Sequence, residues 1–239
     1  MTQASLNRDV TFDIMKGIGI LLVITAHFFS WNHPILGRCI TSFHMPMFFI
    51  LAGYFSKSYT TGEEAKQSIR KYAKRLLPAF IFTQILIILW AILMAFTKDE
   101  GWCSVIRETL SLVWADPHGP ETPWGKLSIG VIWFLFALFF AKSALLFVSR
   151  LKEYAIPVSI MLAVGALLLH KAFPYSIWCI SIGLTALPFV TLGWWFRIHP
   201  IPKWLIIVCV FCWIAAICFS YLGMYDFEYN CYPLISWGP

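Results

Sequence analysis

The sequence predicts an all-α polytopic membrane protein with about seven transmembrane helices and a cytoplasmic N-terminus. Of its 239 residues, 59% are hydrophobic and only 13% are charged, and the mean hydropathy is +0.74. Soluble domains are rarely so apolar. Several runs also reach the roughly 20 apolar residues that a helix needs to cross a hydrocarbon core of about 30 Å. These observations together predict a membrane-embedded helical bundle.

Seven apolar runs are long enough to be spans, and two long polar stretches, 57–75 and 98–128, separate some of them. The predicted spans are 12–31, 39–56, 76–97, 129–148, 155–173, 176–196 and 204–223. We expect residues 1–223 to form a single transmembrane bundle. Residues 224–239 would be an outer tail, and its abrupt stop is consistent with a truncated end.

The orientation follows from the distribution of lysine and arginine. With a cytoplasmic N-terminus, the inner segments hold eleven of these residues and the outer segments hold five. This bias is the positive-inside pattern, and it makes 57–75 a cytoplasmic loop. The net charge of +6 therefore indicates topology, and we expect the lipid bilayer rather than a nucleic acid as a partner.

The first span carries three ionisable residues, Asp13, Lys16 and His27. Lys16 and His27 are close to three turns apart, so they share a helix face at a separation of about 16 Å. Asp13 lies one turn before Lys16, within reach of an ion pair. One interpretation is that Lys16 extends to the inner interface while His27 sits at the outer one. The other is that such groups mark a reactive site inside the bundle.

The second span has His44 near its outer end, just before Pro46. Because the chain runs outward in the first span and inward in the second, His27 and His44 are predicted at similar depth. They could be a general base and its helper, since histidine titrates near neutral pH. Alternatively, His44 bonds a carbonyl freed near Pro46. Without a third or fourth ligand nearby, we expect no metal site.

The segment EEAKQSIRKYAKRLLPAF (63–80) is predicted to be amphipathic, and it ends in a basic cluster before Pro78. It can act as a topology determinant on anionic lipid. It can also bind a phosphate-bearing ligand at the cytoplasmic mouth, because clustered cations suit phosphate groups. The charge pattern alone leaves both readings open.

Several motifs resemble the acyltransferase type 3 family of integral membrane acyltransferases. The residues 12–27 (FDIMKGIGILLVITAH), FHMPMFFILAGYF (43–55) and KRLLPAF (74–80) match the start of that family in order and spacing. GVIWFLFALFF (130–140) and ALPFVTLGWWF (186–196) are similar to later spans. The resemblance covers residues 8 to about 197.

The resemblance implies an enzyme that moves an acyl group, often acetyl from acetyl-CoA, onto a hydroxyl of a surface glycan or exported small molecule. It implies that His27 is the catalytic base, with Lys16 ten intervening residues before it, where the family often has arginine. His44 falls on the family's second-span histidine. Acyl-CoA would be the co-substrate, and the location would be the bacterial inner membrane.

Two features depart from the family. Arg75 matches the second arginine of an RxxR pair, but Tyr72 occupies the position of the first. Lys71 and Lys74 flank that gap, although lysine lacks arginine's bidentate fork. Members of the family also usually have about ten spans, whereas this chain shows about seven.

We therefore expect general-base acyl transfer, with the CoA phosphates near Arg75, Lys74 and Lys71. His27 would take the proton of an acceptor hydroxyl that approaches from the outer side. Lys16, paired with Asp13, would set the local field or guide the donor's arm. The alternatives are a transporter or flippase, for which no inverted repeat is visible, and an inactive scaffold of the same fold.

Overall fold

The computed structural model describes residues 10–29, 34–57, 61–97, 102–115, 117, 121–123, 125–172, 178–199, 204 and 211. Within these residues the protein is mostly helical, which confirms the predicted helical class. The exceptions are two short 3-10 segments, η1 (Gly130–Ile132) and η2 (Ser149–Tyr154), and a hairpin of β1 (Glu121–Thr122) and β2 (Gly125–Lys126). The helices are α1 (Val10–Phe29), α2 (Pro34–Tyr54), α3 (Gly62–Thr97), α4 (Cys103–Trp114), α5 (Trp133–Val148), α6 (Ala155–Ala172) and α7 (Ile180–Ile198).

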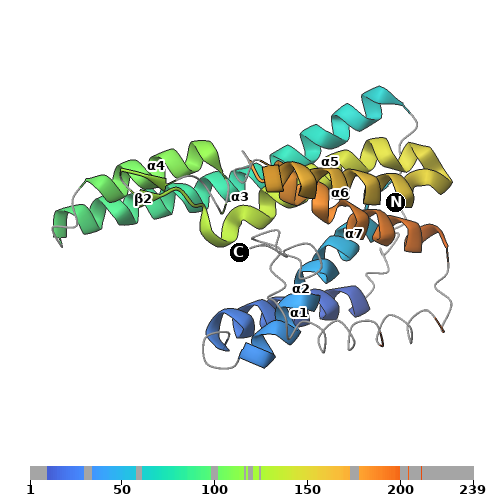
Figure 1. The fold of residues 1–239 in the computed structure, drawn as a ribbon, viewed down its shortest axis with the longest axis horizontal. Helices are drawn as coiled ribbons and strands as arrows, with labels where there is room; N and C mark the ends of the chain where they lie inside the picture. Colours follow the sequence, from blue (N-terminus) through green and yellow to red (C-terminus); the bar gives the residue numbers. More distant parts are fainter. Residues whose placement is uncertain are drawn as a thin grey trace, which may run out of the picture.

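Helix α7 is the centre of the packing. It contacts α2, α5 and α6, whereas α1 packs on α2, and α3 packs on α4 and α5. Figure 1 shows this arrangement, with α3 and α4 side by side at one end and α1 with α2 on another side of the molecule. The fully buried side chains include Phe49 of α2, Leu145 of α5 and Leu187 of α7.

Glycine allows α2 and α7 to cross with their backbones in contact. A Cβ added at Gly53 would overlap the Val190 carbonyl, and one added at Gly193 would overlap the Ile50 carbonyl. The two glycines thus form a reciprocal contact between the helices. Small residues at such crossings are typical of helices that pack in membranes.

Two helical stretches within the described residues are long and apolar enough to cross a membrane, Gly62–Thr97 and Trp133–Ala172. Many large apolar side chains are exposed on the helices, such as Leu21 on α1 and Trp90 on α3. The predicted number of seven spans and the inward N-terminus remain predictions. The predicted span 204–223 and the tail 224–239 lie outside the described residues, apart from 204 and 211.

Helix α3 differs most from the sequence-based expectation. The segment that was expected to be a cytoplasmic loop is helical from Gly62 and continues without interruption through Pro78 to Thr97. Its first turn has a capping box, in which the Glu64 amide donates to Thr61 Oγ1 and the Thr61 amide donates to Glu64 Oε2. The basic residues therefore lie on a regular helix.

The predicted outer loop also contains structure that the sequence analysis did not foresee. Helix α4 lies against α3, and the hairpin β1–β2 contacts α4. Trp178, next to the start of α7, donates from Nε1 to the Val113 carbonyl at 2.9 Å, and the Cys179 thiol donates to the Ala115 carbonyl at 3.1 Å. We refer to α4, the hairpin and residues 178–179 as the outer cap.

Candidate active site and basic cluster

Lys16 is fixed at the contact between α1 and α2. Its Nζ lies 3.8 Å from Asp13 Oδ1 and 4.7 Å from the centroid of the Phe55 ring at the end of α2. The Phe12 ring packs on Tyr54 and Phe55, which brings the start of α1 against the end of α2. The Lys16 side chain remains 47% exposed, so it is accessible to a ligand. The predicted pair of Lys16 with Asp13 is present.

The predicted base is on the same helix, but less of it is described. His27 lies in the last turns of α1, and its side chain is outside the described residues. Its helical position keeps the separation of about 16 Å from Lys16. The relation between the His27 and His44 side chains stays a prediction.

His44 is buried, and its ring is fixed by the backbone. Nδ1 lies 2.7 Å from the Ile40 carbonyl, one turn earlier in α2. A carbonyl can only accept, so Nδ1 carries the proton, and in the neutral ring Nε2 holds the lone pair. The bonded carbonyl belongs to Ile40, whereas the missing N–H of Pro46 affects the carbonyl of Ser42. A positioning or helper role for His44 stays a prediction.

The cations of α3 lie on two different faces. Lys71 and Arg75 are four residues apart and so share one side of the helix, while Lys66 and Arg70 lie away from it, and all four side chains are exposed. Lys74 is also exposed. A third cation, Lys142, lies on the neighbouring helix α5, within electrostatic reach of Lys71 and Arg75.

Lys142 is the residue that the sequence analysis missed. It is half-buried in α5, and its Nζ lies 4.5 Å from the centroid of the Tyr72 ring. Among the described residues, the positive charges of Arg75 and Lys71 repel it. Its signal in the sequence was a single lysine in the apolar run FLFALFFAKSALLF, a feature that marks function in membrane helices. We call Lys71, Arg75 and Lys142, with Tyr72, the α3–α5 basic cluster.

A cavity of about 330 Å³ lies at the ends of α2 and α7. It is lined by Ser56, Lys57, Trp194, Arg197 and Ile198. Arg197 donates from Nη1 to the Ser56 carbonyl at 2.8 Å, which ties the end of α7 to the end of α2. Because Phe55 precedes Ser56, this cavity lies close along the chain to the ring that contacts Lys16.

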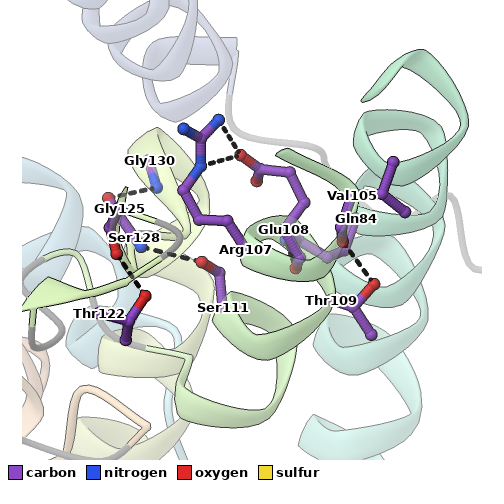
Figure 2. A network of polar contacts seen from close by, with 10 residues as sticks. All are labelled: Gln84, Val105, Arg107, Glu108, Thr109, Ser111, Thr122, Gly125, Ser128 and Gly130. Carbon is purple, nitrogen blue, oxygen red and sulfur yellow. Dashed lines mark hydrogen bonds and ion pairs between the residues drawn. The ribbon is translucent and has the colours of Figure 1, made fainter. Parts of the chain in front are cut away.

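The outer cap is held together by polar contacts, which Figure 2 shows. Gln84, fully buried in α3, donates from Nε2 to the Glu108 carbonyl of α4 at 3.4 Å. The Ser128 amide donates to Ser111 Oγ at 3.0 Å, which joins α4 to the chain after the hairpin. Arg107 and Glu108 form an ion pair at 3.0 Å. The cap is thus an ordered surface at the end of the molecule opposite the start of α3.

The part of the chain that the structure describes contains no group of three His, Cys, Asp or Glu residues able to hold a metal ion. The Cys103 thiol is exposed, and the Cys179 thiol is buried. Trp102 is exposed and packs edge-on against Phe96, and Trp124 lies outside the described residues.

Comparison with known proteins identifies relatives across almost the whole chain. A family model described as an acyltransferase domain matches residues 9–239. The chain is 28% identical over 251 residues to "Nodulation protein NolL" of Mesorhizobium japonicum, a match that covers 96% of this chain and 60% of that protein. It is 24% identical over 246 residues to "Nodulation protein NolL" of Sinorhizobium fredii, covering 94% and 60%. No solved structure matches the chain.

Proposed function

Because the chain belongs to the acyltransferase type 3 family, we propose that it is a membrane O-acyltransferase that uses acyl-CoA, usually acetyl-CoA, as its donor. The acceptor is a hydroxyl of a cell-surface or exported glycan or small molecule. The observation that carries this proposal is the family match over residues 9–239. The chain spans about 60% of the length of the curated relatives that it matches.

In this proposal the reaction is a direct acyl transfer. His27 takes the proton of the acceptor hydroxyl as its oxygen attacks the thioester carbonyl carbon, which forms a tetrahedral intermediate. The carbon–sulfur bond then breaks, the acyl ester is formed, and the imidazolium returns its proton to the departing CoA thiolate. No redox partner is needed. The step conserves atoms and charge with the acceptor and the donor alone.

The donor and the acceptor would enter from opposite ends of the bundle. CoA phosphates bind at the basic start of α3, near Arg75, Lys74 and Lys71, because cations bind phosphate by charge-assisted hydrogen bonds. The acceptor comes from the outer side, toward the end of α1 that holds His27. This requires the N-in orientation that the lysine and arginine bias favours, in a bacterial inner membrane.

Label transfer tests the proposal directly. Membranes that express the chain are incubated with acetyl-labelled acetyl-CoA, and label is counted in extractable glycans and lipids, with membranes lacking the chain as the control. We expect label above the control together with release of CoA thiol. Thiol release without labelled product would indicate simple hydrolysis. Neither signal would contradict the enzyme assignment and favour an inactive scaffold.

Substitutions of Lys16 test whether this residue takes part in acyl transfer or only anchors the first helix at the membrane interface. An exposed pair such as Asp13–Lys16 contributes at most about 1 kcal/mol to stability, so Lys16→Gln should keep the thermal midpoint within roughly 4 °C. We expect transfer to fall about 10- to 100-fold, the value of one charged hydrogen bond. Lys16→Arg should retain activity, because it keeps the charge. Full activity in Lys16→Gln would leave Lys16 as an anchor only.

A further inference from the structure

Lys142 is the one charged residue of helix α5, whose other residues are apolar except Ser143. Helix α5 reads WFLFALFFAKSALLFV, and its neighbours Ala141 and Leu145 are fully buried. A lysine that is half-buried in such a helix loses part of its hydration, which is unfavourable unless another group compensates the charge. The contacts of Lys142 therefore indicate what it is for.

The compensation within the described residues is incomplete. The ring of Tyr72 attracts the ammonium through its π face, at 4.5 Å. The charges of Arg75 and Lys71 both repel it. The ion pairs of the described residues are Asp13 with Lys16 and Arg107 with Glu108, and neither includes Lys71, Arg75 or Lys142. In the part of the chain that the structure describes, three cations from two helices thus lie within electrostatic reach of one another without an ion-paired carboxylate.

A topology signal does not explain this convergence. Lys66 and Arg70, both exposed on α3, already provide positive charge to an inner membrane surface. The charge of Lys142 is half-buried and is repelled by Arg75 and Lys71, which lowers the stability of the fold. It adds nothing to the orientation of the protein in the membrane. A negatively charged ligand that is shared by the three cations would turn the repulsion into attraction.

We propose that Lys71, Arg75 and Lys142 bind a phosphate ester group of the acyl donor. Tyr72 of α3 occupies the position of the first arginine of the family's RxxR pair, and Lys142 of α5 supplies the cation that is missing there. This inference rests on the proposed function, since it takes acyl-CoA as the donor. The ammonium has three N–H donors, and the Tyr72 ring engages one side of it. The Tyr72 ring therefore orients the ammonium, and the remaining donors bind phosphate oxygens. Arg75 adds the bidentate fork that suits phosphate.

Binding is measured apart from turnover. The chain is reconstituted in phosphatidylcholine nanodiscs, and the affinities for CoA and for pantetheine, which lacks phosphate, are measured by calorimetry. We expect Lys142→Gln to weaken CoA binding about 10- to 100-fold, as for the loss of one charged hydrogen bond. Pantetheine binding should be unchanged in the variant. Lys66→Gln, which removes an exposed cation outside the cluster, should bind CoA like the parent.

A double variant tests whether the site requires a positive charge in this region, whichever of the two helices supplies it. The Tyr72 ring lies directly beneath the ammonium, so an arginine at position 72 can bring its charge to the same region. We expect Tyr72→Arg combined with Lys142→Gln to recover most of the CoA affinity. A variant that had merely lost its fold would not be rescued by a second substitution.

The outcomes separate this site from the function on which it rests. CoA binding that depends on Lys142, in a chain that transfers no label, would contradict the proposed function and leave the phosphate site intact. Label transfer with unchanged CoA affinity in Lys142→Gln would overturn the site alone. Repeating the binding measurements in phosphatidylglycerol nanodiscs tests whether the phosphate group belongs to a lipid headgroup. If Lys142→Gln weakens binding of the anionic lipid but leaves the CoA affinity unchanged, the assignment of the site to the acyl donor is overturned.

Discussion

Replacing His27 by alanine is expected to lower acyl transfer by about 100- to 10,000-fold, the range that a general base contributes. The reason is that the acceptor hydroxyl would then attack the thioester with its proton still attached. The measurement is labelled product per mole of protein from acetyl-labelled acetyl-CoA, with CoA affinity determined in parallel. CoA affinity should change little, because the cations that we propose to bind the CoA phosphates belong to α3 and α5, whereas His27 belongs to α1.

His199→Ala is the matched control for this prediction. His199 is exposed, at the end of α7, where its ring stacks on Trp195 at 4.3 Å between centroids. The substitution removes an imidazole from a place that the proposed reaction does not use, so transfer should stay at the parent level. Equal transfer in the parent and in His27→Ala would remove His27 from the mechanism.

Gly193→Ala is expected to give the largest loss of stability. The new Cβ would overlap the Ile50 carbonyl of α2, and a backbone atom in a packed helix cannot move aside as a side-chain end can. Overpacking typically costs about 1–3 kcal/mol, occasionally more. The helices α2 and α7 would have to separate, and both belong to the centre of the packing. The measurement is the thermal midpoint in detergent or nanodiscs.

Gly165→Ala provides the comparison within the same fold. Gly165 lies in α6, and nothing lies within 4 Å of the position that its Cβ would occupy. Alanine is the better helix former by up to about 1 kcal/mol, so this variant should be as stable as the parent or more stable. A midpoint for Gly193→Ala equal to that of Gly165→Ala would contradict the close crossing of α2 and α7.

The sequence was sufficient for the helices but not for how they meet. Apolar runs indicate helices because each must bury or hide its backbone polar groups, and the helices α1, α2, α5, α6 and α7 overlap predicted runs. The start of α3 was assigned to a cytoplasmic loop between two spans, so its continuity with the following span was not expected. Charged residues are good helix formers, and the capping box at Thr61 gave the correct start.

In the candidate site too, contacts within one helix could be predicted from the sequence, whereas contacts between helices could not. The pair of Asp13 with Lys16 depends on spacing within one helix, so the sequence alone could predict it. The contact of Lys142 with Tyr72 depends on the rotation of α5 against α3, which no local pattern encodes. The outer cap was missed for a related reason, since α4 is only 12 residues long and is held by contacts with α3 and with Trp178, just before α7.

The length of α3 has a consequence for where its cations lie. At about 1.5 Å per residue, its 36 residues extend over about 54 Å. A hydrocarbon core of about 30 Å would accommodate that whole length only at an inclination of more than about 50°, beyond the usual upper limit of about 40°. The charged turns before Pro78 must therefore emerge into the headgroups and water as a rigid extension of the spanning part. The phosphate-binding cations would then be positioned by the bundle itself, independently of the composition of the surrounding lipid.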